Sequence, residues 1–395
     1  MLSVYSFVVS ALLLLTSPVG ATPTRPRSFT QLHREGMAQA CRGAALLLGS
    51  VAAPVGAVSC GMCKEKDKLK CVCDSSALVE LDVGQQAVAE QISQGGSSYF
   101  LDPRNERIYD THKRSYIPAR PDVFLPRAIG QKNRVVVVGE VHSDLCHHHA
   151  EFEVVKSLSS GENNLAIGME CFYRQHQQAL DNYIFDHQDI GRLKRETNWK
   201  QAWGYDLNFY AKIFSYAAKK KIRLLGLNCP YPVVQLVGSA GFDSLPASIK
   251  QLLPPLDLSN AKHRQQFVDA INGGASGQGR DSGDLHQSVS LEHMYEAQTL
   301  WDEYMAESAA NFLATRDGKK TTLLVVAGLG HVLGRTGIPD RIRKRTGQEP
   351  FVILPQQVQF SDITGLPDVI TPMTSEDADW VWYTSLRDTP NRKNM

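Results

Sequence analysis

Short apolar runs recur along the central part of the chain, and each has the length of one buried strand. The runs are RVVVV from Arg134, NLAIGM from Asn164, IRLLGL from Ile222 and TTLLVVAGLG from Thr321. Continuous apolar runs of this length, without polar alternation, are typical of strands that are covered on both faces. We therefore predict four buried strands at these positions.

Segments with helical periodicity lie between the first three runs. Their apolar positions recur three or four residues apart and are Phe152, Val155 and Leu158, then Leu180, Tyr183 and Ile184, then Phe209, Ile213 and Tyr216. Alternation of strand and helix predicts a parallel sheet. The expected fold class is α/β, with a central parallel sheet flanked by helices.

The pattern changes between the third and fourth strands. Residues from about 230 to 320 show helical patterns and a Gly- and Ser-rich loop, but no strand-like run. This stretch predicts a small helical lobe inserted into the α/β body. After the fourth run, PFVILP and DWVWYTSL predict two closing strands.

The N-terminal part of the chain predicts a targeting presequence over residues 1–59. An apolar signal-type run is followed by a stretch that is rich in Arg and Ser and poor in acid, and then by a second apolar run. This order predicts entry by a secretory signal into a plastid, and delivery onward to the thylakoid lumen. The alternative is a secreted protein or another lumenal compartment. No transmembrane span is expected in the mature protein, because the first run is short.

Residues 60–97 form a Cys-rich segment with a helical pattern, and the α/β domain follows over residues 98–395, with its helical insertion at about 230–320. The spacing of Cys60, Cys63, Cys71 and Cys73 lacks the second C-x-x-C of a zinc ribbon.

The charge of the chain does not support binding to nucleic acid. The sequence has 42 Lys and Arg against 41 Asp and Glu, a net charge of +1, and no basic stripe that would neutralise phosphates.

Polar side chains follow all four predicted strands. Glu140 and His142 follow the first strand, Glu170 the second, Asn228 the third and His331 the fourth. The carboxyl ends of parallel strands meet at one edge of a sheet, which is where ligands bind. We therefore expect residues that are almost two hundred positions apart to converge on one crevice.

A group of His and Glu side chains supports several kinds of chemistry. Glu140, His142, Glu170 and His331 are candidate ligands of a divalent metal. The same four residues could activate water, with a histidine as general base oriented by a carboxylate. A third possibility is haem, whose iron takes His or Tyr ligands between aromatic walls, and Tyr205 lies in an aromatic segment.

Five segments, in this order and spacing, resemble the ChaN-like haem-binding uptake family, which shares a superfamily with Tiki, TraB and the erythromycin esterases. They are VVVVGEVHSDLCHHH, LAIGMECFYRQHQQALDNY, LLGLNCP, WDEYMAESAANFL and VVAGLGHVLGRTGIPDRI. The resemblance covers roughly residues 99–355. It implies a parallel sheet with a small helical lobe, and haem bound between paired subunits, hence a homodimer.

The resemblance also implies roles for individual residues. Glu140, His142, Glu170 and His331 match the family's Glu and His positions, and His147 and His148 match a pair of histidines that often follows. The predicted haem-binding residues are His142, His147, His148, Tyr205, Asn228 and His331. The leading interpretation is a protein that binds haem or a related tetrapyrrole in plastid tetrapyrrole or iron handling. The alternative is a hydrolase that uses Glu140, His142, Glu170 and His331, with or without a metal.

Overall fold

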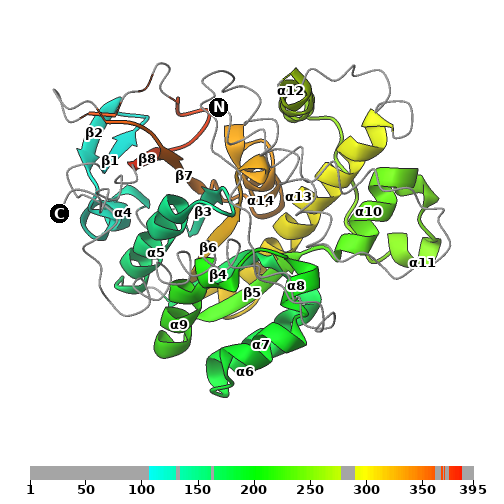
Figure 1. The fold of residues 1–395 in the computed structure, drawn as a ribbon, viewed down its shortest axis with the longest axis horizontal. Helices are drawn as coiled ribbons and strands as arrows, with labels where there is room; N and C mark the ends of the chain where they lie inside the picture. Colours follow the sequence, from blue (N-terminus) through cyan, green and yellow to red (C-terminus); the bar gives the residue numbers. More distant parts are fainter. Residues whose placement is uncertain are drawn as a thin grey trace, which may run out of the picture.

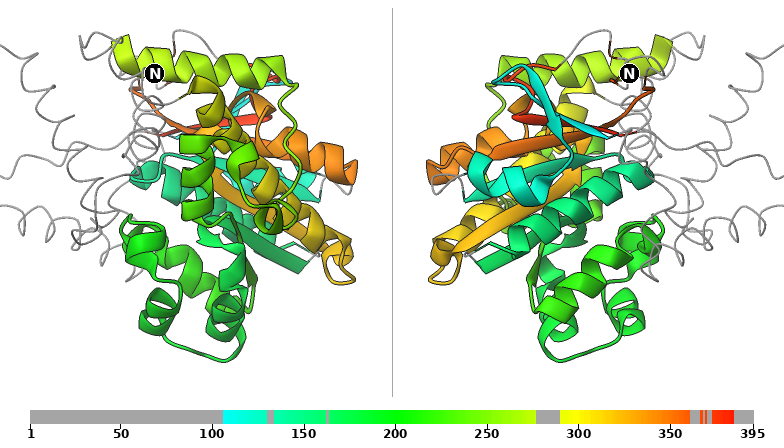
Figure 2. Two further views of the ribbon diagram at one scale, coloured as in Figure 1. Left: turned by 90° about the vertical axis from the view of Figure 1, so that its right-hand side faces the viewer. Right: turned by 90° about the vertical axis from the view of Figure 1, so that its left-hand side faces the viewer.

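A computed structural model of the chain describes residues 106–129, 134–161, 164–276, 290–360, 366–367, 369 and 373–384. The predicted presequence and Cys-rich segment lie outside these residues. In the described part, eight strands form one mostly parallel sheet with helices on both faces (Figures 1 and 2). The predicted α/β class is confirmed. Every helix in the described part is too short or too polar to span a membrane.

The four predicted strands are present, and they lie side by side. They are β3 (Val135–Glu140), β4 (Asn164–Tyr173), β5 (Arg223–Asn228) and β6 (Thr321–Gly328). The two predicted closing strands are β7 (Phe351–Gln357) and β8 (Trp380–Thr384). All pairs between these six strands are parallel, whereas β1 (Arg107–Asp110) and β2 (Ser115–Pro118) add an antiparallel edge.

The order of the strands explains how distant residues meet. The sheet runs β2-β1-β8-β7-β3-β6-β4-β5, so β6 lies between β3 and β4, although it comes after both in sequence. Glu140 at the end of β3 pairs in register with Gly328 at the end of β6. The segment that carries His331 therefore leaves the sheet between the strands that carry Glu140 and Glu170.

Strand β4 extends beyond Glu170, which the sequence had placed just past a strand end. Its register against β5 shifts between Met169 and Tyr173. There β5 passes so close that a Cβ on Gly226 would lie 2.2 Å from the carbonyl oxygen of Tyr173. Such a contact excludes any side chain at position 226, since only glycine lets the two backbones approach this closely.

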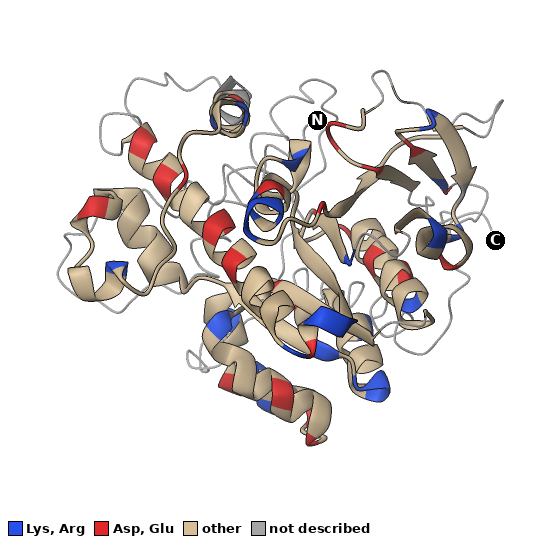
Figure 3. Cartoon of the chain, turned by 180° about the vertical axis from the view of Figure 1, so that it is seen from behind, with Lys and Arg blue, Asp and Glu red and all other residues tan. Residues whose placement is uncertain are grey.

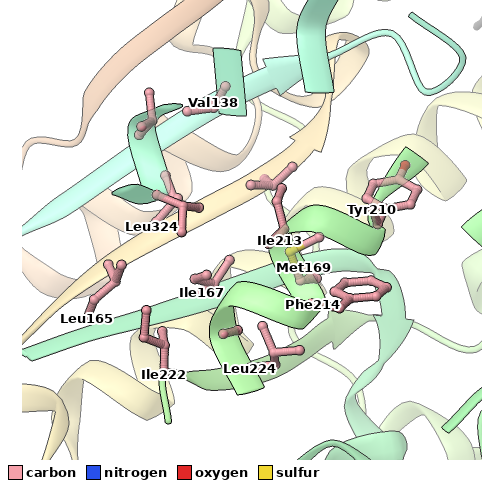
Figure 4. Close-up of a cluster of buried hydrophobic side chains, with 14 of the residues drawn as sticks. Val138, Leu165, Ile167, Met169, Tyr210, Ile213, Phe214, Ile222, Leu224 and Leu324 are labelled. Carbon is pink, nitrogen blue, oxygen red and sulfur yellow. The ribbon is translucent and has the colours of Figure 1, made fainter. Parts of the chain in front are cut away.

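Alternate side chains of the strands enter two different cores, because successive residues of a strand point to opposite faces. Val136 and Val138 enter the first core, where the sheet meets four helices. Figure 4 shows part of this core, including Val138. The helices are α4 (Pro121–Ile129), α5 (Leu145–Ser159), α6 (Gln177–Phe185) and α9 (Ala211–Lys220). Two short helices, α7 (Ile190–Glu196) and α8 (Trp199–Ala202), add Leu193 and Trp199 to this core.

Val135 and Val137 enter the second core, against α13 (Leu291–Ala314) and α14 (Ile338–Thr346). The stretch between β5 and β6 is helical in its described residues. It contains α10 (Tyr231–Ala240), α11 (Ala247–Lys250), α12 (Ala261–Ser276) and α13. The N-terminal half of α13 packs with α10 and α12 in a third core, so one helix joins this lobe to the sheet (Figure 1).

Short 3-10 turns complete the connections. They are η2 (Arg174–His176), η3 (Leu207–Phe209), η4 (Phe242–Ser244), η5 (Gly318–Lys320), η6 (Leu329–His331) and η7 (Leu333–Arg335). Two of them place residues of the predicted site. Turn η6 directly follows β6 and ends on His331, and η3 lies between Tyr205 and α9.

Candidate functional site

The predicted His and Glu residues lie at the C-terminal edge of the sheet and are almost fully buried. Glu140, His142, Glu170 and His331 each expose 4% of their surface or less. Buried charges are costly unless they are paired. The structure pairs them in two groups, one around Glu140 and one around Glu170.

Glu140 is the centre of the first group. Its Oε1 atom lies 2.7 Å from His142 Nδ1 and accepts a hydrogen bond of 2.8 Å from the Tyr210 hydroxyl. Its Oε2 atom faces His148 Nδ1 at 3.3 Å. Burial alone would raise the pKa of Glu140, but the charges of His142 and His148 bring it down to about 2. The carboxylate is therefore ionised at neutral pH.

Helix α5 supplies the histidines that follow. Its first turn is capped by Asp144, whose side chain accepts a hydrogen bond of 2.8 Å from the backbone N–H of Cys146. This start turns His147 and His148 toward the sheet. His147 Nδ1 accepts from the backbone N–H of Val141 at 3.0 Å, and burial lowers the pKa of His147. His147 therefore helps to hold the exit of β3.

Glu151 joins the first group one turn further along α5. It is fully buried, and its Oε2 atom lies 3.1 Å from His148 Nδ1. Burial and the negative charge of Glu140 raise the pKa of Glu151 to about 8. Burial lowers the pKa of His148, but Glu151 and Glu140 outweigh it and raise that pKa to about 9.

His331 is the centre of the second group. Its Nδ1 atom lies 2.7 Å from Asp302 Oδ1, and its Nε2 atom lies 3.4 Å from Glu170 Oε1. Glu170 Oε2 accepts a hydrogen bond of 2.5 Å from the backbone N–H of Gly328. Burial would lower the pKa of His331, but Glu170 and Asp302 raise it to about 10. His331 is therefore an imidazolium at neutral pH.

Asp302 comes from the lobe helix α13, along which acidic residues recur (Figure 3). It is fully buried, and its second oxygen lies 2.9 Å from His263 Nε2 and 3.9 Å from Arg341 Nη1. Arg341 in turn donates to Glu303 at 3.1 Å. Burial opposes ionisation of Asp302, but these partners and His331 hold its pKa well below the usual range.

The two groups meet across β6. Gly328 is the register partner of Glu140, and its backbone N–H donates to Glu170. The charge of His142 also contributes to lowering the pKa of Glu170. The predicted convergence of the strand ends is therefore present for Glu140, His142, Glu170 and His331.

Aromatic side chains cover the first group. The ring centroid of His142 lies 4.6 Å from that of Trp203 and 4.9 Å from that of Tyr205. The loop that carries them is held by the Trp199 indole, which donates to the carbonyl of Tyr205 at 2.8 Å. Gly204 turns the chain there with a φ of +85°, a conformation that favours glycine. Tyr205 stays half-buried, so this loop joins the site to the surface.

Asn228 is placed differently from the other predicted residues. It is buried at the end of β5 opposite Tyr173, and its Oδ1 atom has no hydrogen-bond partner among the described residues.

The four metal ligands predicted from the sequence are divided between the two groups above. Among the described residues, the group of three possible ligands whose atoms all lie within 4.8 Å of one another is instead Glu140, His148 and Glu151.

Sequence reasoning missed Glu151, Asp302, His263 and Arg341. Glu151 follows His148 by three residues, on the face of α5 that also buries Val154. The available signal was its place four residues before Val155, which puts a carboxylate on the side of the helix that carries predicted apolar positions. Asp302 and Arg341 lie in two of the five family-like segments, which was a signal for the residues but not for their partners. His263 lies outside those segments. The three residues come from different helices, so their proximity depends on how those helices pack.

Comparisons with known proteins give the family and the fold. A family model described as haem-binding uptake, Tiki superfamily, ChaN, matches residues 129–342. ChaN of Campylobacter jejuni, in a structure described as showing cofacial haem binding, is similar with a TM-score of 0.52 and 18% identity over 71% of this chain and 97% of that chain. A mutant erythromycin esterase in its open conformation has a TM-score of 0.33 and 12% identity over 68% of this chain and 80% of that chain. No curated protein matches the chain.

The pairing of His331 with Asp302 predicts a pH-dependent stability. The pKa of His331 is raised from 6.5 to about 10 on folding, so the stability it contributes is complete below pH 6.5 and is lost as the pH rises toward 10. We expect Asp302→Asn to lower the free energy of unfolding at neutral pH by about 3 kcal/mol, because it breaks a buried ion pair. It should also flatten the decline between pH 7 and 10. Urea denaturation at several pH values measures both effects.

The matched control is Asp181→Asn. Asp181 pairs with Arg223 at 2.6 Å, and an arginine does not titrate in this range, so the slope between pH 7 and 10 should stay that of the wild type. An Asp302→Asn variant with an unchanged slope would show that Asp302 does not hold the proton of His331.

Proposed function

The chain belongs to the ChaN family of haem-binding proteins in the Tiki superfamily, and on this premise we propose that it binds haem or a related tetrapyrrole. The observation that carries the proposal is the contact between His142 and Tyr205, whose ring centroids lie 4.9 Å apart. Imidazole and phenolate are both axial ligands of haem iron. Trp203 adds an aromatic face next to His142. The donor set and its surroundings therefore fit haem.

The exposure of the loop supports the same site. His142 is buried, but Tyr205, Leu207 and Phe209 are each half-buried, so part of each side chain is exposed to solvent. We propose that these three side chains form an apolar strip on which the flat face of a macrocycle lies. Burial and the negative charges of Glu170 and Glu140 raise the pKa of Tyr205 above its usual range. The same negative charges favour a cationic iron centre near the phenol oxygen.

The strip of one chain would cover only one face of a bound haem. A macrocycle that lies with one face on the loop would leave its other face in water, which is unfavourable for an apolar surface. A second copy of the chain, related by a two-fold axis, would cover that face with the same loop. We therefore propose that haem is held between paired subunits.

A hydrolase is the second candidate, and the pair formed by His331 and Asp302 favours it. A histidine oriented by a carboxylate is the arrangement that general acid–base catalysis uses. However, the raised pKa of His331, about 10, leaves it protonated at neutral pH. It can then donate a proton but cannot accept one from water. The pKa of Glu170 is lowered, chiefly because His331 outweighs the effect of burial, which makes Glu170 a weak base. The geometry therefore supports haem binding better.

A haemin titration of the purified full-length chain tests the leading proposal. We expect a saturable shift of the Soret absorbance at one haemin per chain or per pair of chains. Tyr205→Phe and His142→Ala should identify the ligand. The variant that lacks the ligand should bind at least about tenfold more weakly, since tenfold corresponds to ~1.4 kcal/mol. Light scattering on the same samples would report whether haemin pairs the chains.

Tyr216→Phe is the matched control for this titration. Tyr216 is also a half-buried tyrosine, but its hydroxyl bonds to Ser159 on α5 at 2.8 Å, away from the loop. It should bind haemin as the wild type does. A Soret shift no larger than that of an unrelated protein of similar size would refute haem binding.

Ester hydrolysis separates the two candidate functions. If the chain is a haem binder alone, wild type and His331→Ala should hydrolyse p-nitrophenyl acetate at the same background rate. A loss of about 10²–10⁴-fold in His331→Ala, with an unchanged circular dichroism spectrum, would instead assign acid–base catalysis to His331.

We further propose that the protein works in plastid tetrapyrrole or iron handling. The support is the order of apolar, Arg- and Ser-rich, and apolar segments in residues 1–59. A fluorescent protein fused behind these residues should accumulate in the plastid of an alga whose plastid lies within the secretory route. Fluorescence in the medium or the endoplasmic reticulum would contradict this location.

A further inference from the structure

One buried cluster contains a carboxylate, Glu151, that has no role in the functions proposed above. Glu140, His148 and Glu151 each present one ligand atom, and these atoms all lie within 4.8 Å of one another. The three residues expose 2%, 6% and 0% of their surface. Neither haem binding nor hydrolysis uses Glu151, so the presence of a second carboxylate in this part of the core needs its own explanation.

The orientation of His148 shows that the cluster must hold a proton or a cation. Its Nε2 atom lies 3.0 Å from the backbone carbonyl oxygen of His142, and a carbonyl can only accept, so Nε2 carries a proton. In a neutral imidazole the lone pair on Nδ1 then points at Glu151 Oε2, 3.1 Å away, and at Glu140 Oε2, 3.3 Å away. Three electron-rich atoms face one another, so a proton or a metal cation must lie among them.

The hydrogen bonds of Glu140 and Glu151 engage one oxygen of each carboxylate. Glu140 Oε1 is engaged by His142 and by the Tyr210 hydroxyl, which directs Oε2 toward His148. Among the described residues, neither Glu140 Oε2 nor Glu151 Oε1 has a hydrogen-bond partner. A buried carboxylate oxygen without a partner is unfavourable. Both oxygens belong to residues whose ligand atoms converge.

The spacing and the surroundings of the three side chains also fit a metal site. Two ligands bound to one tetrahedral Zn²⁺ at about 2.0–2.2 Å lie roughly 3.3 Å apart. The distances of 3.1 and 3.3 Å from His148 Nδ1 agree with this value. Metal-bound histidines also donate their other N–H to a carbonyl or carboxylate, as His148 does to His142. Phe209 stacks on His148 with ring centroids 5.2 Å apart and shields it from water.

We propose that Glu140, His148 and Glu151 form a buried site for a divalent cation of the Zn²⁺ type, with one imidazole and two carboxylate ligands. The site is distinct from the His331 group and does not depend on whether the chain binds haem. The cation would replace the protons that otherwise lie among the three side chains. It would also fix Glu140, and through it His142 and Tyr210, in one orientation.

Zinc binding to the metal-free full-length chain tests this proposal. The chain is stripped with a chelator and dialysed against Zn²⁺, and bound metal is counted by mass spectrometry. Glu151→Gln should bind one zinc fewer per chain, or bind it at least about tenfold more weakly, since even outer-shell changes at metal sites cost about 10–100-fold. Gln has the shape of a protonated Glu, so the metal-free fold should be retained.

Glu153→Gln is the matched control. It lies two residues further on the same helix, is partly exposed, and pairs with Lys156 at 2.6 Å. It should bind as much zinc as the wild type. Equal zinc content in wild type and Glu151→Gln would overturn the proposal. Any zinc held by Cys60, Cys63, Cys71 and Cys73 is common to all three proteins and cancels in this comparison.

A second measurement needs no variant. Co²⁺ bound to the wild-type chain should show the visible bands of four-coordinate cobalt with nitrogen and oxygen ligands. Binding at cysteines would add the intense absorption of cobalt–thiolate bonds. A spectrum with thiolate features and no separate nitrogen–oxygen component, or no bound cobalt at all, would overturn the proposal even if Glu151→Gln failed to fold.

Discussion

The pairing of buried carboxylates with histidines at the C-terminal edge of the sheet is the constraint on which the rest of the site depends. Glu140, Glu170 and Asp302 are almost completely removed from water. The desolvation of a charge in a protein interior is costly, and attraction to an opposite charge offsets it only in good geometry. The three carboxylates therefore require His142, His148 and His331 to be in place, and the histidines require the carboxylates.

This mutual neutralisation also limits what the buried groups can do. His331 is held in its protonated form and Glu170 in its ionised form, because each stabilises the charge of the other. Neither is then suited to take a proton from water. The Tyr205 ring lies next to His142 and is itself half-buried, so this side chain reaches the surface. The charged pairs stabilise the edge of the sheet, and the carboxylates of Glu170 and Glu140 add to the effect of burial in raising the pKa of Tyr205.

Helix α13 connects this edge to the helical lobe. Its N-terminal half packs in the core of the lobe, its C-terminal half packs on the sheet, and Asp302 lies between the two parts. The lobe therefore does more than cover the sheet, since it supplies the carboxylate that faces His331. His263 and Arg341 bind the same carboxylate from α12 and α14. A shift of α13 would break several buried ion pairs at once. The position of the lobe is therefore coupled to the pairing of His331 with its carboxylates.

The sequence by itself determined the α/β class, the positions of β3 to β8 and the convergence of Glu140, Glu170 and His331 on one edge. It could do so because buried parallel strands are continuous apolar runs, and the ends of parallel strands must share an edge. Only the tertiary structure decided which carboxylate faces which histidine. Placing β6 between β3 and β4, and turning Glu151 and Asp302 inward, depend on contacts between elements that are distant in sequence. The periodicity of the sequence shows which face of a helix is buried, but it does not show which element packs against that face.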